Sequence, residues 1–234
     1  MYLFPIIGAL IGLFAAAYFQ GCVFLVSHIF SFIKGIISFV PETLFLKLIT
    51  AGMTLSFLLV LTGLQHFDGL VDLGNAIGVN RLEDRAAMAH AWTVTHKGAF
   101  LAVVVEFAAF LGLFFLNANF AFKAIIAAEI SAKLAMVTIA WIGKPAHKGL
   151  GSRFIKSVRM KKRQVIAYFL AALVILPLLG LTGGLVILLS IVSGVAMERI
   201  GNHVFGGVPG DLIGATNEAA RAVTLIVLAG VLTL

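Results

Sequence analysis

Long apolar runs, separated by shorter polar segments, dominate the chain. A helix needs roughly 20 apolar residues to cross a bilayer core about 30 Å thick, and seven stretches approach that length. They lie at residues 2–30, 43–65, 98–118, 120–142, 164–180, 182–198 and 218–234. The runs are continuous and do not alternate as the strands of a membrane β-barrel would. The pattern predicts an all-α, polytopic integral membrane protein of about seven transmembrane helices, forming a single membrane domain over residues 1–234.

Three polar stretches remain between the predicted spans, at residues 66–97, 143–163 and 199–217. Two spans separate each pair of stretches, so all three are expected on one side of the membrane. They and their edges hold thirteen of the 17 basic residues. These are Arg81, Arg85, Lys97, Lys144, Lys148, Arg153, Lys156, Arg159, Lys161, Lys162, Arg163, Arg199 and Arg221. Because cytoplasmic loops carry an excess of Lys and Arg, these loops and any active site that they form are expected to face the cytoplasm.

Composition narrows the class of protein further. The chain is 61% hydrophobic and 12% charged, whereas a soluble domain is about 45–50% apolar and roughly 25% charged, so a soluble enzyme is excluded. The net charge of +7 lies in short loops, which indicates attraction to the lipid bilayer or to phosphate and not to nucleic acid. The single cysteine, Cys22, excludes an intramolecular disulfide. The start of the chain lacks a basic region and a cleavage site, so no removable signal peptide is expected.

The segment from Gln65 to Asn75 carries the strongest chemical signal. In a helix, Asp68, Asp72 and Asn75 fall at positions i, i+4 and i+7, on one face. Two carboxylates and an amide oxygen at a membrane boundary suit Mg²⁺, which proteins commonly hold by one or two carboxylates together with substrate phosphates. The competing interpretation is a solvated polar start of a loop.

A second signal lies between Gly206 and Glu218. Asp211 and Glu218 are seven residues apart and share a helical face. Gly207 and Gly210 allow the backbone to approach a ligand closely, and the start of a following helix offers free N–H groups to a phosphate. Glu218 could instead interact with the dipole of that helix as an acid in its first turn.

Basic and histidine residues give weaker candidates. Lys148 is flanked by glycines and could bind an anion, whereas the run 161–163 directly adjoins a span and is expected to contact lipid headgroups. Arg85 belongs either to a salt-bridged surface turn or to a phosphate clamp. The spacing of the histidines makes no zinc motif, although His96 or His203 could act as a general base.

Two charged residues fall inside predicted spans. Glu106 and Lys133 lie at similar depth in adjacent antiparallel spans, so they are expected to pair, with Glu129 as a competing partner of Lys133. Ions inside a membrane often mark a functional cavity, so a secondary transporter is one alternative function.

Four motifs, taken together, resemble the cobalamin-5′-phosphate synthase family, the adenosylcobinamide-GDP ribazoletransferases of coenzyme B12 assembly. They are the D-G-L-V-D run at 68–72, the R-A-A-M run at 85–88, the K-G-L-G run at 148–151 and the G-G-x-x-G-D-x-x-G-A-x-x-E pattern at 206–218. Asn75 stands where a third carboxylate is usual, and His90 lies near a position often occupied by aspartate. The resemblance covers essentially the whole chain.

The resemblance implies a Mg²⁺-dependent, multi-pass enzyme of the inner (cytoplasmic) membrane. It would join adenosylcobinamide-GDP to α-ribazole, or to α-ribazole 5′-phosphate, with release of GMP. Asp68, Asp72, Asn75 and Asp211 would be the metal ligands, with His96 or a carboxylate as the base. The residues expected to contact substrate are Arg85, Lys148, Gly207, Gly210 and Glu218.

The closest rival function is a CDP-alcohol-type membrane phosphotransferase. The first motif of that family is similar to the pattern D-x-x-D-G, with the two aspartates three residues apart. This sequence lacks that order, since Asp68 and Asp72 are four residues apart. The transporter alternative is disfavoured because most of the acidic and glycine-rich chemistry lies at one membrane face and not at the midplane. The sequence leaves open the number of Mg²⁺ ions, the phosphorylation of the acceptor and whether a homo-oligomer forms.

Overall fold

The computed structural model of the chain describes residues 2–34, 41–89, 91 and 93–232. These residues form ten α-helices and one short 3-10 helix. The helices are α1 (Phe4–Lys34), α2 (Glu42–Leu61), α3 (Gln65–Ile77), α4 (Leu82–Ala89), α5 (His96–Phe115), α6 (Ala118–Ile142), α7 (Leu150–Arg159), η1 (Met160–Lys162), α8 (Arg163–Leu179), α9 (Leu181–Phe205) and α10 (Gly210–Val231). Within the described ranges the only strand-like pairing is a single bridge between Pro145 and Val208. The predicted all-α class is therefore confirmed.

The number of membrane spans also agrees with the sequence pattern. Six helices, α1, α2, α5, α6, α9 and α10, are long and apolar enough to cross a bilayer. Helices α7 and α8 meet at a bend of 80° and make a seventh span if they are counted together. Gly180, with φ of 60°, provides the tight turn between α8 and α9, because glycine adopts positive φ without steric cost. The chain is thus a multi-pass membrane protein.

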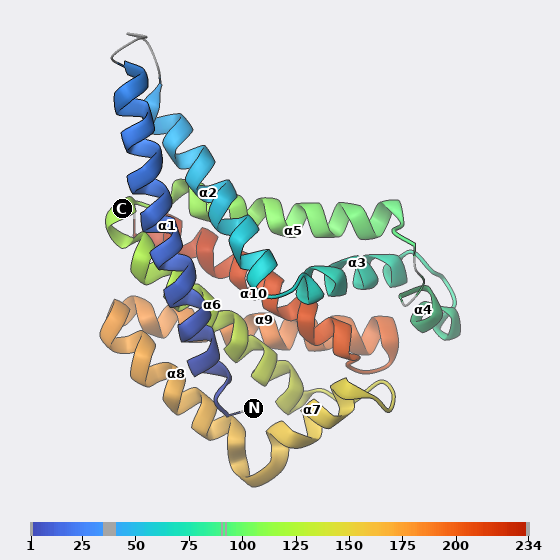
Figure 1. Cartoon of the computed structure of the whole chain (residues 1–234). Coiled ribbons are helices and arrows are strands. Elements are labelled where there is room, and N and C mark those ends of the chain that lie inside the picture. The colour runs from blue at the N-terminus through green and yellow to red at the C-terminus, as the bar shows by residue number, and fades with distance from the viewer. Residues whose placement is uncertain (1, 35–40, 90, 92, 233–234) are drawn as a thin grey trace.

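Helices α6 and α10 lie at the centre of the molecule (Figure 1). In α6, 89% of the apolar stretch is buried inside the protein, and in α10 78%, whereas the corresponding stretches of the other four single-helix spans are 22–33% buried. The buried residues of α6 are rich in alanine. Small side chains allow neighbouring helices to approach closely where lipid provides no hydrophobic driving force. The surrounding helices therefore turn large apolar residues to the lipid and small ones to α6 and α10.

Glycines on the outer helices mark the closest of these approaches. A Cβ atom added to Gly8 or Gly12 of α1 would lie 2.6 Å from a backbone atom of α6. A Cβ added to Gly112 of α5 would lie 2.6 Å from a side-chain atom of α10, and one added to Gly194 of α9 the same distance from a side-chain atom of α6. Substitution at these positions would force the helices apart.

The third polar stretch is shorter than the sequence suggests. Helix α9 continues to Phe205 and α10 already begins at Gly210, so only residues 206–209 connect them. Thr216 and Asn217, expected in this loop, are buried within the protein, and residues 210–217 extend the predicted last helix by two turns at its start. The expected loop at 199–217 is therefore wrong in extent.

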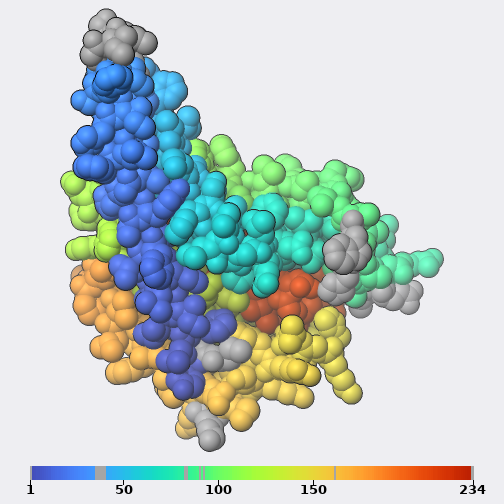
Figure 2. Space-filling view, in the orientation of Figure 1, coloured from blue at the N-terminus to red at the C-terminus, as the bar shows by residue number. Residues whose placement is uncertain are grey.

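Helices α3, α4 and α7 gather beside the N-terminal part of α10, away from the protruding hairpin of α1 and α2 (Figure 1). In the space-filling view, α10 (red) is visible between α3 and α7 at this end of the molecule (Figure 2). This is where the polar motifs of the sequence come together.

Candidate active site

The first acidic motif lies on α3 as expected. Helix α2 ends at a left-handed turn through Gly63 (φ 69°) and Leu64 (φ 60°), and α3 begins directly after it. Asp68 is exposed, Asp72 is half-buried, and Asn75 is buried. The three side chains thus form a stripe that runs from the protein surface towards its interior.

The second acidic motif is placed against the first by a close crossing of α3 and α10. A Cβ atom on Gly69 would collide with the carbonyl oxygen of Asp211, so glycine is needed at that point of the crossing. Asp211 is in the first turn of α10 and is half-buried. Residues 142 positions apart in the sequence therefore lie side by side.

The crossing creates a cavity, here called the acidic cavity, of about 900 Å³ including its open mouth. Its described lining is Asp68, Val71, Asp72, Ala89, Ala91, Thr93, Val94 and Asp211. Three of these described lining residues are carboxylates, and none is a lysine or an arginine. Such a surface favours the binding of a cation, either alone or bound to a substrate.

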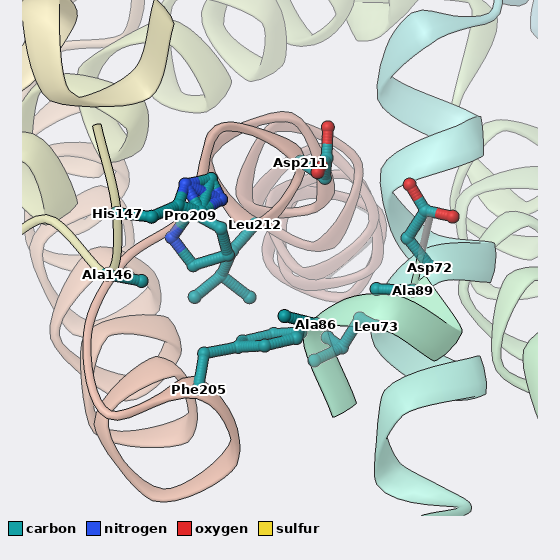
Figure 3. Close-up of a pocket in the computed structure, with 10 residues that line it drawn as sticks. All are labelled: Asp72, Leu73, Ala86, Ala89, Ala146, His147, Phe205, Pro209, Asp211 and Leu212. Carbon is teal, nitrogen blue, oxygen red and sulfur yellow. The ribbon is translucent and has the colours of Figure 1, made fainter. Parts of the chain in front are cut away.

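A smaller pocket of about 480 Å³ adjoins the acidic cavity and shares Asp72, Ala89 and Asp211 with it. Asp72 and Asp211 project into it from two different helices, and His147 and Phe205 lie on its other side (Figure 3). His147 was not singled out in the sequence, because it is one of six histidines without a spacing that distinguishes it.

The carboxylates suit Mg²⁺ in chemical type, since this ion prefers oxygen ligands. Among the residues described, no three His, Cys, Asp or Glu side chains are close enough to hold a metal by themselves. A site completed by substrate phosphates fits both observations, because one or two carboxylates then suffice.

Asn75, expected as a metal ligand, makes hydrogen bonds within the protein. Its Oδ1 accepts hydrogen bonds from the Thr95 N–H (3.0 Å) and the Thr95 hydroxyl (2.7 Å), and its Nδ2 donates to the Thr93 carbonyl (2.9 Å). Both lone pairs of the amide oxygen are thereby used. Asn75 fixes the segment before α5 onto α3.

Arg85 is likewise engaged with the protein backbone. Its Nε donates to the Val79 carbonyl (2.9 Å) and its Nη1 to the carbonyls of His203 and Val204 (3.1 and 3.2 Å). The carbonyls of His203 and Val204 lie in the last turn of α9, where a cation is favoured by the helix dipole. Arg85 therefore joins α4 to α9 and is not among the described lining residues of the acidic cavity, and its expected contact with substrate stays a prediction.

The glycines of the second motif bring loops together. A Cβ on Gly207 would lie 2.8 Å from the Lys144 carbonyl oxygen, and the neighbouring Val208 N–H donates to that same carbonyl at 2.7 Å. Gly210 begins α10 and contacts Gly151 at the start of α7. Close contacts within the protein are therefore enough to explain why glycine stands at these positions. The expected contacts with a ligand stay a prediction.

Glu218 belongs to a buried charge cluster, defined here as Glu129, Lys133, Asn217, Glu218 and Arg221. The Arg221 guanidinium is fully buried and pairs with both Glu129 and Glu218. Lys133 Nζ donates to Asn217 Oδ1 at 2.6 Å. His66 Nδ1 also lies 3.5 Å from Glu218 Oε1, and Glu106 of α5 is a further buried acid beside the cluster. Glu218 is thus engaged within the protein, and its expected contact with substrate stays a prediction.

The expected pair of Glu106 and Lys133 is wrong. No hydrogen bond or ion pair joins them among the described residues, and neither carboxyl oxygen of Glu106 has a hydrogen-bond partner there. Glu129 pairs with Arg221 instead. Arg221 is buried in α10 and is not a loop residue. Twelve of the thirteen basic residues that indicated the orientation of the protein therefore remain.

The remaining candidates lie outside the acidic cavity. His96 lines a pocket between α3 and α5, and His203 lines another beside Arg85. Lys148 is exposed one residue after His147. His90 lies outside the described residues. The structure thus brings Asp68, Asp72 and Asp211 together and separates His96, His203 and Arg85 from them.

Comparison with known proteins identifies the family. Residues 1–229 match the family described as cobalamin-5-phosphate synthase. The chain is 33% identical over 225 residues to the adenosylcobinamide-GDP ribazoletransferase of Methanocella arvoryzae, covering 86% of this chain and 82% of that protein. It is 34% identical over 189 residues to the protein of the same name from Thermococcus onnurineus, covering 80% and 79%. No solved structure matches significantly. The chain therefore belongs to the cobalamin-5-phosphate synthase family.

Proposed function

We propose that the chain is a Mg²⁺-dependent transferase that joins adenosylcobinamide-GDP to α-ribazole, free or 5′-phosphorylated, and releases GMP. The observation that carries the proposal is the meeting of Asp72 and Asp211, from two distant motifs, at one cavity. The similarity to relatives named adenosylcobinamide-GDP ribazoletransferase supports the choice of reaction.

The proposed reaction is a displacement at phosphorus. A hydroxyl oxygen of the acceptor forms a bond to the cobinamide-side phosphorus of the diphosphate, and the bond from that phosphorus to the GMP oxygen breaks. GMP leaves with the electron pair, and the hydroxyl proton passes to a base or to water. Such a transfer depends mainly on alignment and on neutralisation of phosphate charge.

The residues of the acidic cavity would carry out these tasks. Asp72 and Asp211, with Asp68 farther along the same wall, would hold Mg²⁺ together with substrate phosphates, and the bound ion would supply positive charge to the diphosphate. The crossing of α3 and α10 at Gly69 fixes Asp72 relative to Asp211, so the donor is held by two rigid helices. His147 lies where a proton could be accepted near both carboxylates, which makes it a better candidate for the base than His96.

A reconstituted assay tests the proposal directly. The purified protein is incubated with adenosylcobinamide-GDP, α-ribazole or its 5′-phosphate, and increasing Mg²⁺, and GMP release is measured. We expect release that requires both the acceptor and Mg²⁺. No release with either acceptor, or release that continues after chelation of Mg²⁺, would contradict the proposal.

We further propose that the acidic cavity faces the cytoplasm from the inner membrane. The twelve loop cations that remain after Arg221 is removed still greatly outnumber Lys34 and Lys123 in the opposite connections. Cys22 is buried, so a single introduced cysteine can be labelled selectively. Lys148→Cys should react with a membrane-impermeant maleimide in inverted vesicles and not in right-side-out vesicles; the reverse result would invert the topology.

A further inference from the structure

A second large cavity meets the acidic cavity at Asp211, in the first turn of α10. It occupies about 1200 Å³ including its open mouth, between α1, α3, α6, α7 and α10. Among the described lining residues, Asp211 is the only one that the two cavities share. A ligand in either cavity would therefore meet its neighbour at Asp211.

The wall of this second cavity is mainly apolar and aromatic. Phe4 of α1 and Phe154 of α7 line it, with ring centroids 5.0 Å apart and ring planes inclined by 50°. Met136 and Ile213 continue the apolar surface from α6 and α10. Pockets of this kind hold flat organic groups, with a few polar side chains that fix the orientation of the ligand.

Arg153 supplies the cationic group of this wall. It is exposed, and the structure shows no hydrogen bond or ion pair of its guanidinium within the described part of the chain. The two neighbouring arginines differ, because Arg159 donates to the carbonyls of Trp141 and Gly143, and Arg163 donates to Ser157. The guanidinium of Arg153 is thus available for a ligand, and its planar fork matches a phosphate.

The arrangement of the two cavities matches the needs of the proposed reaction. In a displacement at phosphorus, the attacking and leaving oxygens lie roughly in line on opposite sides of the reacting atom. The leaving GMP and the attacking acceptor must therefore approach from different directions. The acidic cavity suits the diphosphate of the donor, and the aromatic cavity suits a nucleoside with a flat base.

We propose, resting on the proposed function, that the cavity between Phe4, Phe154, Met136 and Ile213 binds the base of the acceptor nucleoside and that Arg153 binds its 5′-phosphate. Arg153 is then a specificity-determining residue, which favours the phosphorylated acceptor over the free one. An anionic lipid headgroup shares the phosphate chemistry, and the comparison of two acceptors distinguishes these sources.

The kinetic test uses Arg153→Gln with both acceptors at saturating adenosylcobinamide-GDP. The KM for α-ribazole 5′-phosphate should rise about 10- to 100-fold, as expected for lost hydrogen bonds to a charged group. The KM for free α-ribazole and the kcat should change less than about twofold. Lys156→Gln removes the same charge from the same helix, outside the described lining of the cavity, and should alter neither KM.

A binding measurement decides the question even if turnover fails. Equilibrium binding of α-ribazole 5′-phosphate to the detergent-solubilised protein, without donor, should weaken by a similar factor in Arg153→Gln and not in Lys156→Gln. Equal effects on both acceptors, or no effect on either, would overturn the proposal, and the second result is also what a lipid-bound Arg153 would give. Absence of GMP release together with Arg153-dependent binding would contradict the proposed function alone.

Discussion

Helix α10 carries two groups of charged residues, one at an open cavity and the other enclosed in the protein. Near its N-terminus, Asp211 joins Asp68 and Asp72 around a cavity whose described wall contains no lysine or arginine. Two turns further on, Glu218 and Arg221 belong to the buried charge cluster, where Arg221 pairs with both Glu129 and Glu218 inside the protein. Carboxylates that line an open cavity can be reached by a ligand, whereas ion pairs enclosed inside the protein hold helices together. Burial and pairing, more than residue type, thus separate binding residues from structural ones.

The largest effect is expected from disrupting the buried charge cluster. Arg221→Met leaves the carboxylates of Glu129 and Glu218 buried without their shared partner, which should cost about 3–5 kcal/mol of unfolding free energy. The measurement is the thermal unfolding midpoint in detergent. Arg199→Met is the control, because the Arg199 side chain is 81% exposed on α9. Equal midpoints for the two variants would show that the cluster contributes little to stability.

Changes in the carboxylates of the acidic cavity should affect turnover and not folding. Asp72→Asn or Asp211→Asn is expected to lower GMP release by at least about 10²–10³-fold, comparable to the loss of one group that stabilises transition-state charge. Membrane insertion and the unfolding midpoint should remain near those of the unaltered protein. Near-full turnover of either variant at saturating Mg²⁺ would refute the assignment of the acidic cavity as the active site.

The helix crossing that joins the two motifs gives a third, smaller effect. Gly69→Ala places a methyl group against the Asp211 carbonyl, and such overpacking typically costs about 1–3 kcal/mol. Turnover should fall as well, because Asp72 and Asp211 are pushed apart. Gly184→Ala is the matched control, since a Cβ there meets nothing within 4 Å and alanine favours the helix. If both variants behave alike, the close crossing is not what aligns the carboxylates.

The smallest effect is expected at a histidine away from the acidic cavity. His96→Gln should change kcat by less than about twofold, because His96 lines a separate pocket. His147→Gln removes a residue that lines the pocket with Asp72 and Asp211 and should reduce kcat more. Steady-state GMP release is measured for both variants. A larger loss of kcat in His96→Gln than in His147→Gln would favour His96 as the general base, as the sequence predicted.

The fold was largely predictable because apolar run length is a local property. Seven stretches were expected, and the structure has six spanning helices and a bent pair that can make the seventh. The error lay at α10, whose first two turns contain Asp211, Thr216 and Asn217 and resemble a loop. These polar residues are accommodated by contacts with α3 and α6, and such contacts are not encoded in the neighbouring sequence.

The site was predictable only in part. The spacing of Asp68 and Asp72 predicts one helical face, and the helix is present. The partners of Asn75 and Arg85 include residues 18 and 118 positions away, so the sequence around them does not reveal these contacts. The pairing of Arg221 with Glu129 spans 92 residues, and a single sequence holds no local pattern that reveals it.

The buried pairing of α6 with α10 has a consequence for biosynthesis. Ribosomes complete α6, with Glu129 and Lys133, well before they produce the Arg221 and Asn217 that satisfy these charges. Until then α6 would expose ionised groups to hydrocarbon, which is costly. Stable integration of the middle of the protein must therefore await its last helix, and a chain truncated after α9 should be retained by the insertion machinery or degraded.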